Sequence, residues 1–434
     1  MPSCFKVSKA RFMRLRCWLV AGASVICSPA IAQQSPGPPA PTNSEPPPVQ
    51  QNAAPPDRGF SFKPDAGIVY QSGDFRITTW GYAERAIDPK GPDYFRRLRQ
   101  GAEFDLPRIN DRLRVAAVYE VDLTNTNVLG INRGPAGSFN SRDSENLYLA
   151  LQNPDDPGKL RLLFGHNTYI VSREDNLSSG NLPTINRSLI LEEHGSTNTF
   201  GPQIGVQLQQ ALSPKVTLLA SIGDNKGGLN AQERHAGFGH AVAAKILLAP
   251  ITDDKTGRKL TSGFAVDRTT GIRDRTFTLA TAIGFSPLGG VAATGTKTTG
   301  EADLAYTFPL LGQPTTVEAE AIYSNFSESN SDVGGGYAMV QFSLFDAPHT
   351  GDLDLFARYD AVSLGTASID GRATQQALRA GVNYNLPYTN KLASLHAEYA
   401  HNSISGPAAI VSDGSPGNEF RVVLRVSLQR YLRH

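Results

Sequence analysis

The chain has 434 residues, and its 41 Lys and Arg nearly balance its 40 Asp and Glu, giving a formal net charge of +1. Nucleic-acid binding therefore has no basic excess to support it. The mean hydropathy is −0.26, which is too polar for a bundle of membrane-spanning helices. After residue 32, no stretch approaches the roughly 18 apolar residues that one such helix needs.

Residues 1–32 have the three parts of a secretory signal peptide. Five basic residues precede an apolar run from Cys17 to Cys27, and Ala30-Ile31-Ala32 fits the cleavage site. The run is too short to span a bilayer, so a membrane anchor is not predicted. All the cysteines lie in this segment, so we expect the exported chain to contain no disulfide.

Residues 33–59 are predicted to be a disordered linker. Nine prolines stand among small and polar residues between positions 35 and 57, and this composition cannot bury a core. The simplest role is a tether between the cleavage site and the folded domain. Contact with the cell wall or with a partner is the alternative.

From residue 60 onward, the recurring unit is a segment of about 8–13 residues in which polar and apolar side chains alternate. Alternation places successive side chains on opposite faces of a β-strand. In the last segment, every second residue from Phe420 to Leu428 is apolar, whereas Arg421 and Arg425 lie on the opposite face. The sixteen predicted strands are 75–86, 94–106, 112–123, 145–152, 159–166, 203–212, 215–223, 238–249, 275–286, 299–308, 315–325, 336–346, 351–363, 373–386, 391–402 and 418–430.

The connections between these strands alternate in length. Turns of two to six residues follow most even-numbered strands, whereas most connections after odd-numbered strands are longer. Short periplasmic turns, long external loops and an even strand number are typical of a transmembrane antiparallel β-barrel in the bacterial outer membrane. We therefore predict an all-β barrel over residues 60–434, with residues 33–59 as a periplasmic linker. The connection at 250–274 is the exception, because it should be short; it indicates an insertion or misplaced strands.

The longest connection, residues 167–202 after the fifth strand, is predicted to fold into the lumen. It combines the apolar pieces Ile170-Val171 and Leu189-Ile190-Leu191 with charged residues that include Arg173 and Arg187. A fully solvated loop would not need the apolar pieces. A sixteen-stranded barrel also leaves an aqueous channel that its wall side chains cannot fill. The loop would therefore narrow a pore; an external cap is the alternative.

Several segments carry a resemblance to a known family. They are Tyr94-Phe-Arg-Arg97, Gly101-Ala-Glu-Phe104, Val118-Tyr-Glu-Val-Asp122, Leu160-Arg-Leu-Leu-Phe-Gly165, Ser178-Ser179 and Ile185-Asn-Arg-Ser-Leu189. In these pieces the chain resembles the phosphate-selective porin O and P family of bacterial outer membranes. The resemblance implies a sixteen-stranded trimeric porin with an inward loop, in which Arg96, Arg97 and Arg187 draw anions.

The chain also departs from the pattern of that family. Around Trp80-Gly-Tyr82, no arginine occupies the position where the family usually has one on the first strand. No lysine follows the Ser-Ser pair, and Tyr431 is followed by three more residues instead of ending the chain. The resemblance therefore supports a porin more strongly than it supports selectivity for phosphate.

Strand alternation places further basic side chains on the wet face of the predicted barrel. Anion selection needs Arg or Lys at a constriction, where low-dielectric walls focus the electric field. Glu103, Asp105, Glu120 and Asp122 share that face, so a wall of mixed charge without strong preference is the alternative. The expected pore-lining or anion-contact residues are Arg96, Arg97, Arg99, Arg112, Arg114, Arg173, Arg187, Arg421 and Arg425.

No zinc spacing, phosphate loop, dinucleotide fingerprint or G-x-S-x-G turn occurs in the sequence, so no catalytic residue, metal or cofactor is predicted. We expect a porin that works as a homotrimer in outer-membrane lipid and passes small hydrophilic solutes, chiefly anions and including phosphate. One alternative is an outer-membrane phospholipase using His194 and Ser196, although adjacency in sequence does not make a catalytic triad. The other is a secreted, soluble β-sandwich that binds a partner.

Overall fold

A computed structural model gives the arrangement of the chain from residue 58 onward. It describes residues 58–63, 67–87, 94–123, 144–155, 159–167, 170–174, 182–191, 203–213, 215–224, 241–251, 276–287, 296–327, 331–347, 351–365, 371–387, 389, 392–406 and 416–427. All of these belong to one compact unit, Pro56–His434. The predicted signal peptide and all of the predicted linker except its last two residues lie outside the described residues.

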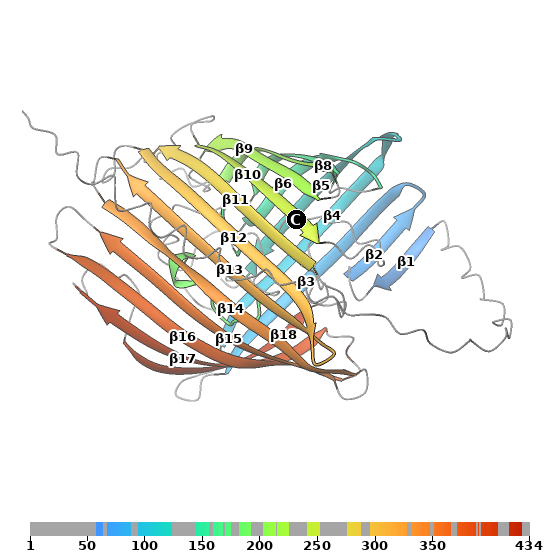
Figure 1. Ribbon diagram of the computed structural model, residues 1–434. Helices are drawn as coiled ribbons and strands as arrows, with labels where there is room; N and C mark the ends of the chain where they lie inside the picture. The colour runs from blue at the N-terminus through green and yellow to red at the C-terminus, as the bar shows by residue number, and fades with distance from the viewer. Residues whose placement is uncertain are drawn as a thin grey trace, which may run out of the picture. The chain divides into compact units, whose positions relative to one another are not determined.

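Eighteen strands form one antiparallel sheet, and sixteen of them, β3 to β18, close into a barrel (Figure 1). The closing strands are β18 and β3, whose paired residues run from Val422↔Ile87 to Ser427↔Tyr82. The barrel strands are β3 (Phe75–Ile87), β4 (Tyr94–Asn110), β5 (Leu113–Asp122), β6 (Ser144–Gln152), β7 (Leu160–Asn167), β8 (Gln203–Ser213), β9 (Val216–Asp224), β10 (Ala241–Ile251), β11 (Thr276–Pro287), β12 (Thr296–Leu310), β13 (Gln313–Phe326), β14 (Ser331–Ala347), β15 (Gly351–Gly365), β16 (Arg372–Asn385), β17 (Ala393–Ser405) and β18 (Gly417–Ser427). The predicted barrel and its strand number are confirmed.

The two faces of the barrel wall are inverted relative to those of a soluble protein. Large apolar side chains such as Leu378 and Phe420 are more than half exposed on the outer face, whereas Lys245, Glu301 and Asp360 are buried on the inner face. An apolar band outside and polar side chains inside are what a barrel in lipid requires. The alternation read from the sequence produces this inversion, because strand side chains change face at every residue.

Two short strands precede the barrel and were not predicted. β1 (Arg58–Lys63) pairs with β2 (Gly67–Ser72) along its whole length. β2 pairs in turn with the first part of β3, from Ile68↔Thr79 to Ser72↔Phe75. The hairpin therefore pairs with the same edge of β3 that pairs with β18 further along the strand. It begins at Arg58, two residues before the predicted start of the barrel domain.

Tight turns join the strands on the short-turn side. Leu310 pairs with Gln313, so the turn between β12 and β13 is only Leu311-Gly312, and both residues have positive φ (54° and 79°). Positive φ at both positions is the requirement of a type I′ hairpin. The strands continue through Pro309 and Pro314, which the sequence analysis had assigned to the turn.

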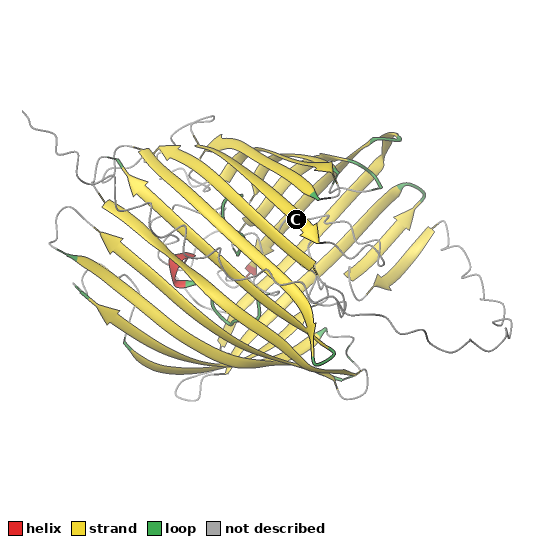
Figure 2. Cartoon of the chain, in the orientation of Figure 1, coloured by secondary structure: helices red, strands yellow, loops and turns green. Residues whose placement is uncertain are grey.

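The long connection between β10 and β11 lies outside the described residues. The strands on either side of it pair directly, with Val242 opposite Phe285, so both were placed correctly. Figure 2 shows strands as the dominant element and a short helical segment, residues 189–191. In the part of the chain that the structure describes, no helix has the length and apolarity to cross a membrane.

Candidate functional site

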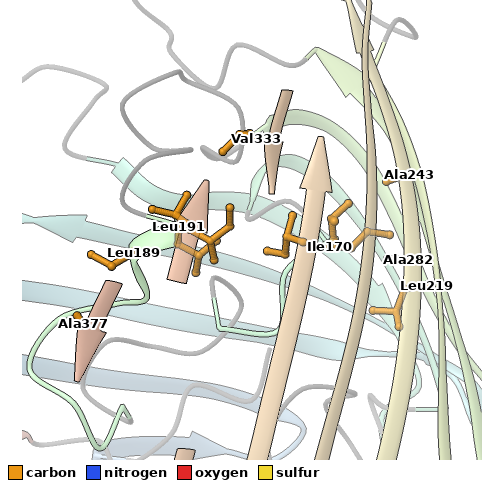
Figure 3. Close-up of a cluster of buried hydrophobic side chains, with 12 residues drawn as sticks. Ile170, Leu189, Leu191, Leu219, Ala243, Ala282, Val333 and Ala377 are labelled. Carbon is orange, nitrogen blue, oxygen red and sulfur yellow. The ribbon is translucent and has the colours of Figure 1, made fainter. Parts of the chain in front are cut away.

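The loop after β7 lies inside the barrel, as predicted. Two of its segments are described, residues 170–174 (the first arm) and 182–191 (the second arm). Ile170 and Leu189-Ile190-Leu191 are buried in a cluster with apolar side chains from the inner wall (Figure 3). These wall residues are Leu219, Ala243, Ala282, Ile322, Val333, Val362 and Ala377. The apolar pieces that favoured inward folding are therefore the ones that pack against the wall.

The first arm is attached to the wall through its backbone. The carboxylate of Glu320 on β13 accepts the N–H groups of Arg173 (2.9 Å) and Glu174 (3.1 Å). Lys245 Nζ on β10 donates to the carbonyl of Val171 at 3.1 Å. Each bond joins a wall side chain to a backbone group in a buried place, where leaving the backbone group unpaired would be costly.

The Arg173 side chain is also engaged by the wall. Its guanidinium lies 3.5 Å from a carboxylate oxygen of Asp303 and 3.9 Å from one of Glu318. Burial would lower the pKa of Arg173, but these carboxylates outweigh it and the pKa is raised. The charge of Arg173 is therefore balanced within the wall.

The second arm is attached to other strands of the same inner wall, β16 to β18. Arg425 on β18 donates to the carbonyls of Leu182 (2.7 Å) and Thr184 (3.1 Å). The Asn383 amide on β16 donates to the carbonyl of Pro183 at 2.9 Å. The N–H of Ile185 donates to Glu398 on β17 at 2.9 Å. Residues 182–185 are thus bound at consecutive backbone positions.

One buried arginine joins the two arms. Arg358 on β15 donates to the Glu174 carboxylate of the first arm at 2.6 and 3.2 Å, and to Thr184 Oγ1 of the second arm at 3.2 Å. It also pairs with Asp360 at 2.8 Å. Burial would raise the pKa of Glu174, but Arg358 and the hydrogen bonds from Ser188 lower it below its ordinary value, so Glu174 is a carboxylate at neutral pH.

Arg187 lies between these anchors. Within the two described arms, every residue is buried except Asn186 and Arg187, which are partly exposed. Asn186 and Arg187 are therefore the solvent-accessible part of the two described arms, while Ile185 and Ser188 on either side are buried.

The wall formed by β3 to β7 carries a second group of the predicted arginines. Arg97 lies 3.9 Å from Glu84, Arg99 lies 3.7 Å from Glu120, and Arg114 lies 3.6 Å from Asp105. Their side chains are 16%, 11% and 11% exposed. These arginines are closer to water than those that hold the loop, and their ion pairs are longer.

The remaining predicted residues lie apart from this group. Arg112 is exposed in the turn between β4 and β5, where its N–H donates to Asn110 Oδ1 at 2.8 Å. Arg421 pairs with Glu419 at 2.5 Å near the start of β18. Arg96 belongs to β4, but its side chain is outside what the structure describes.

Sequence reasoning did not single out the wall residues that hold the loop. Lys245, Glu320, Arg358 and Glu398 all lie in strands that were predicted, with the parity of the inner face. The signal that could have found them is charge at alternate positions inside a strand, as in Glu318-Ala-Glu320 and Arg358-Tyr-Asp360. A charge in the middle of a barrel strand has to face the lumen.

Ser394 and His396 form a serine–histidine pair in the wall, with Ser394 Oγ 2.8 Å from His396 Nε2. Arg425 Nη1 lies 3.3 and 3.5 Å from the two ring nitrogens of His396. The group beside the ring is thus a guanidinium, whereas a catalytic triad places a carboxylate there to orient the base.

His194 and Ser196 lie outside the described residues. Within the described ranges, no cluster of three or more His, Cys, Asp or Glu residues could hold a metal ion.

No family model and no curated protein matches the sequence. Solved structures do match the fold. OmpT, an outer membrane protein of Vibrio cholerae, aligns at 10% identity with a TM-score of 0.53, over 82% of this chain and 98% of that one. Its trimer form aligns at 11% identity with a TM-score of 0.51, over 81% and 98%.

The outer membrane channel DcaP of Acinetobacter baumannii aligns at 15% identity with a TM-score of 0.50, over 81% of this chain and 97% of that one. At these identities, the likeness concerns the fold. This chain has the fold of a bacterial outer-membrane β-barrel.

Proposed function

We propose that the protein is an outer-membrane porin that lets small hydrophilic solutes, chiefly anions, diffuse passively. The observation that carries this proposal is the loop bound inside a closed barrel whose outer face is apolar and whose inner face is charged. A barrel of this size encloses water, and an internal loop narrows the passage without closing it. Matching a named channel, DcaP, in fold supports the same function.

The preference for anions rests on Arg187 and on the arginines of β4 and β5. Arg187 is one of the two partly exposed residues of the described arms. Arg97, Arg99 and Arg114 keep part of their side chains in contact with water. A cationic group at a narrow point raises the local concentration of anions, because field lines are focused there. Phosphate belongs to this class, as does any small hydrophilic anion.

The location and assembly belong to the same proposal. Residues 1–32 would direct export and be removed, and residues 33–59 would be a periplasmic linker to the barrel. The apolar outer face would contact outer-membrane lipid. A homotrimer is supported by the trimer form of OmpT, whose fold this chain shares.

The test is conductance of the purified, folded protein in planar bilayers. We expect discrete steps in KCl, arriving in groups of three for a trimer, and a zero-current potential in a salt gradient that shows anion preference. Added phosphate should reduce the chloride current if phosphate enters the same constriction. Absence of steps from folded protein would refute the porin, whereas cation preference would refute only the anion assignment.

A further inference from the structure

The backbone on both sides of Arg187 is tied to a single wall residue, Arg358. On the preceding side, Arg358 donates to Thr184 Oγ1 at 3.2 Å, and that hydroxyl donates to the carbonyl of Asn186 at 2.7 Å. This carbonyl belongs to the peptide bond that leads into Arg187. The hydroxyl has one proton to give, so accepting from Arg358 directs that proton to Asn186.

On the following side, the link runs through Glu174. Arg358 donates to both oxygens of this carboxylate, at 2.6 and 3.2 Å, and the N–H of Ser188 donates to it at 2.8 Å. Two N–H···O bonds from one guanidinium fix the orientation of a carboxylate as well as its position. The peptide group after Arg187 is therefore fixed by the same side chain as the one before it.

Arg358 itself has little freedom to move. It is 2% exposed, it pairs with Asp360 at 2.8 Å, and its guanidinium lies 4.0 Å from the centre of the Tyr337 ring. A planar group that is stacked on one face and bonded along its edges keeps a single orientation. The rigidity of the strand is thereby passed to the backbone on both sides of Arg187.

We propose that Arg358, Glu174 and Thr184 form a bracket that positions Arg187 and so sets the ion selectivity of the constriction. This inference rests on the proposed function, because it assigns a role within the same pore. Arg358 and Glu174 act as positioning residues: they bind no solute, and their effect on ions passes through the backbone of Asn186 and Ser188.

Three variants distinguish positioning of Arg187 by the bracket from a simple effect of net charge on selectivity. Arg358→Met removes a positive charge from the inner wall, Glu174→Ala removes a negative one, and Thr184→Val changes no charge and little volume. If only the net charge of the wall mattered, the first change would lower anion preference, the second would raise it and the third would have no effect. If position matters, all three lower it.

The experiment measures the zero-current potential and the open-channel noise of each variant in planar bilayers with a KCl gradient. A unit charge about 7 Å from an ion in water changes ion occupancy by about 2.7-fold, in opposite directions for anions and cations, so removing it would lower the anion-to-cation ratio by about sevenfold. The three variants displace the charge of Arg187 without removing it. We therefore expect a smaller fall in the permeability ratio, about threefold, in all three variants, with more open-channel noise as residues 186–188 gain freedom. The control is Arg372→Met, which breaks an exposed ion pair with Asp332 that has no contact with either arm.

Selectivity that follows the sign of the charge change would overturn the proposal, and so would wild-type behaviour of both Thr184→Val and Glu174→Ala. Should Arg358→Met not fold, those two variants decide, because each leaves Arg358 paired with Asp360. A wild-type protein without conductance would refute the proposed function itself, before any variant is compared.

Discussion

Two arginines approach the carboxylate of Glu84 on β3, one from β18 and one from β4, and they show how the two sides of this carboxylate differ. Arg425 on β18 lies 3.2 Å from it, is buried, and also binds the backbone of the second arm. Arg97 on β4 lies 3.9 Å from the same carboxylate and is 16% exposed. The residue type and the partner are the same, but one arginine holds the loop and the other is bound less closely and is partly exposed. Burial and backbone partners, more than charge, separate a structural arginine from one available to a solute.

The largest expected effect on stability comes from replacing the buried arginine, Arg425. Arg425→Met keeps the apolar stem, but removes the nearer of the two arginines beside the fully buried Glu84 and frees the carbonyls of Leu182 and Thr184. Removing one partner of a buried pair costs about 3–5 kcal/mol. We expect the free energy of unfolding, from urea titration of the barrel in lipid vesicles, to fall by about this amount. A loss below about 1 kcal/mol would show that Arg425 does not hold the loop.

The matched change, Arg97→Met on β4, is expected to have a small effect on the free energy of unfolding and a measurable effect on ion selectivity. Arg97→Met removes a longer, partly hydrated ion pair, and such pairs contribute about 1 kcal/mol or less. The same urea titration should therefore change little. Anion preference should decrease without added noise, because the loop stays bound. A large loss of stability would place Arg97 with the structural arginines instead.

Much of the fold could be predicted because side chains of a barrel strand face lipid and lumen in turn, so apolar and polar residues alternate along its sequence. The alternation from Phe420 to Val426 identified β18, and apolar pieces such as Ile170-Val171 identified a loop that has to be buried. The β1–β2 hairpin was missed because six-residue strands next to a proline-rich stretch carry too few alternations to stand out. Strand ends were also misplaced where Pro309 and Pro314 continue the hairpin as paired residues.

Less of the candidate site could be predicted from the sequence. Alternation put Arg425 on the inner face, but its partner Leu182 is 243 positions away along the chain. Periodicity gives the face of a strand and not the distance across the lumen. For the same reason, sequence reasoning placed Arg173 and Arg187 in one group. In the structure, Arg173 is buried against Asp303, whereas Arg187 is partly exposed.

The most direct test of the account is the zero-current potential of Arg187→Ala in a KCl gradient, compared with that of the wild-type protein. The account predicts that conductance steps persist and that the anion-to-cation permeability ratio falls by about sevenfold, because loss of a unit charge about 7 Å away lowers anion occupancy and raises cation occupancy by about 2.7-fold each. An unchanged ratio in a folded, conducting variant would contradict it, since the inward loop would then narrow the barrel without selecting what passes.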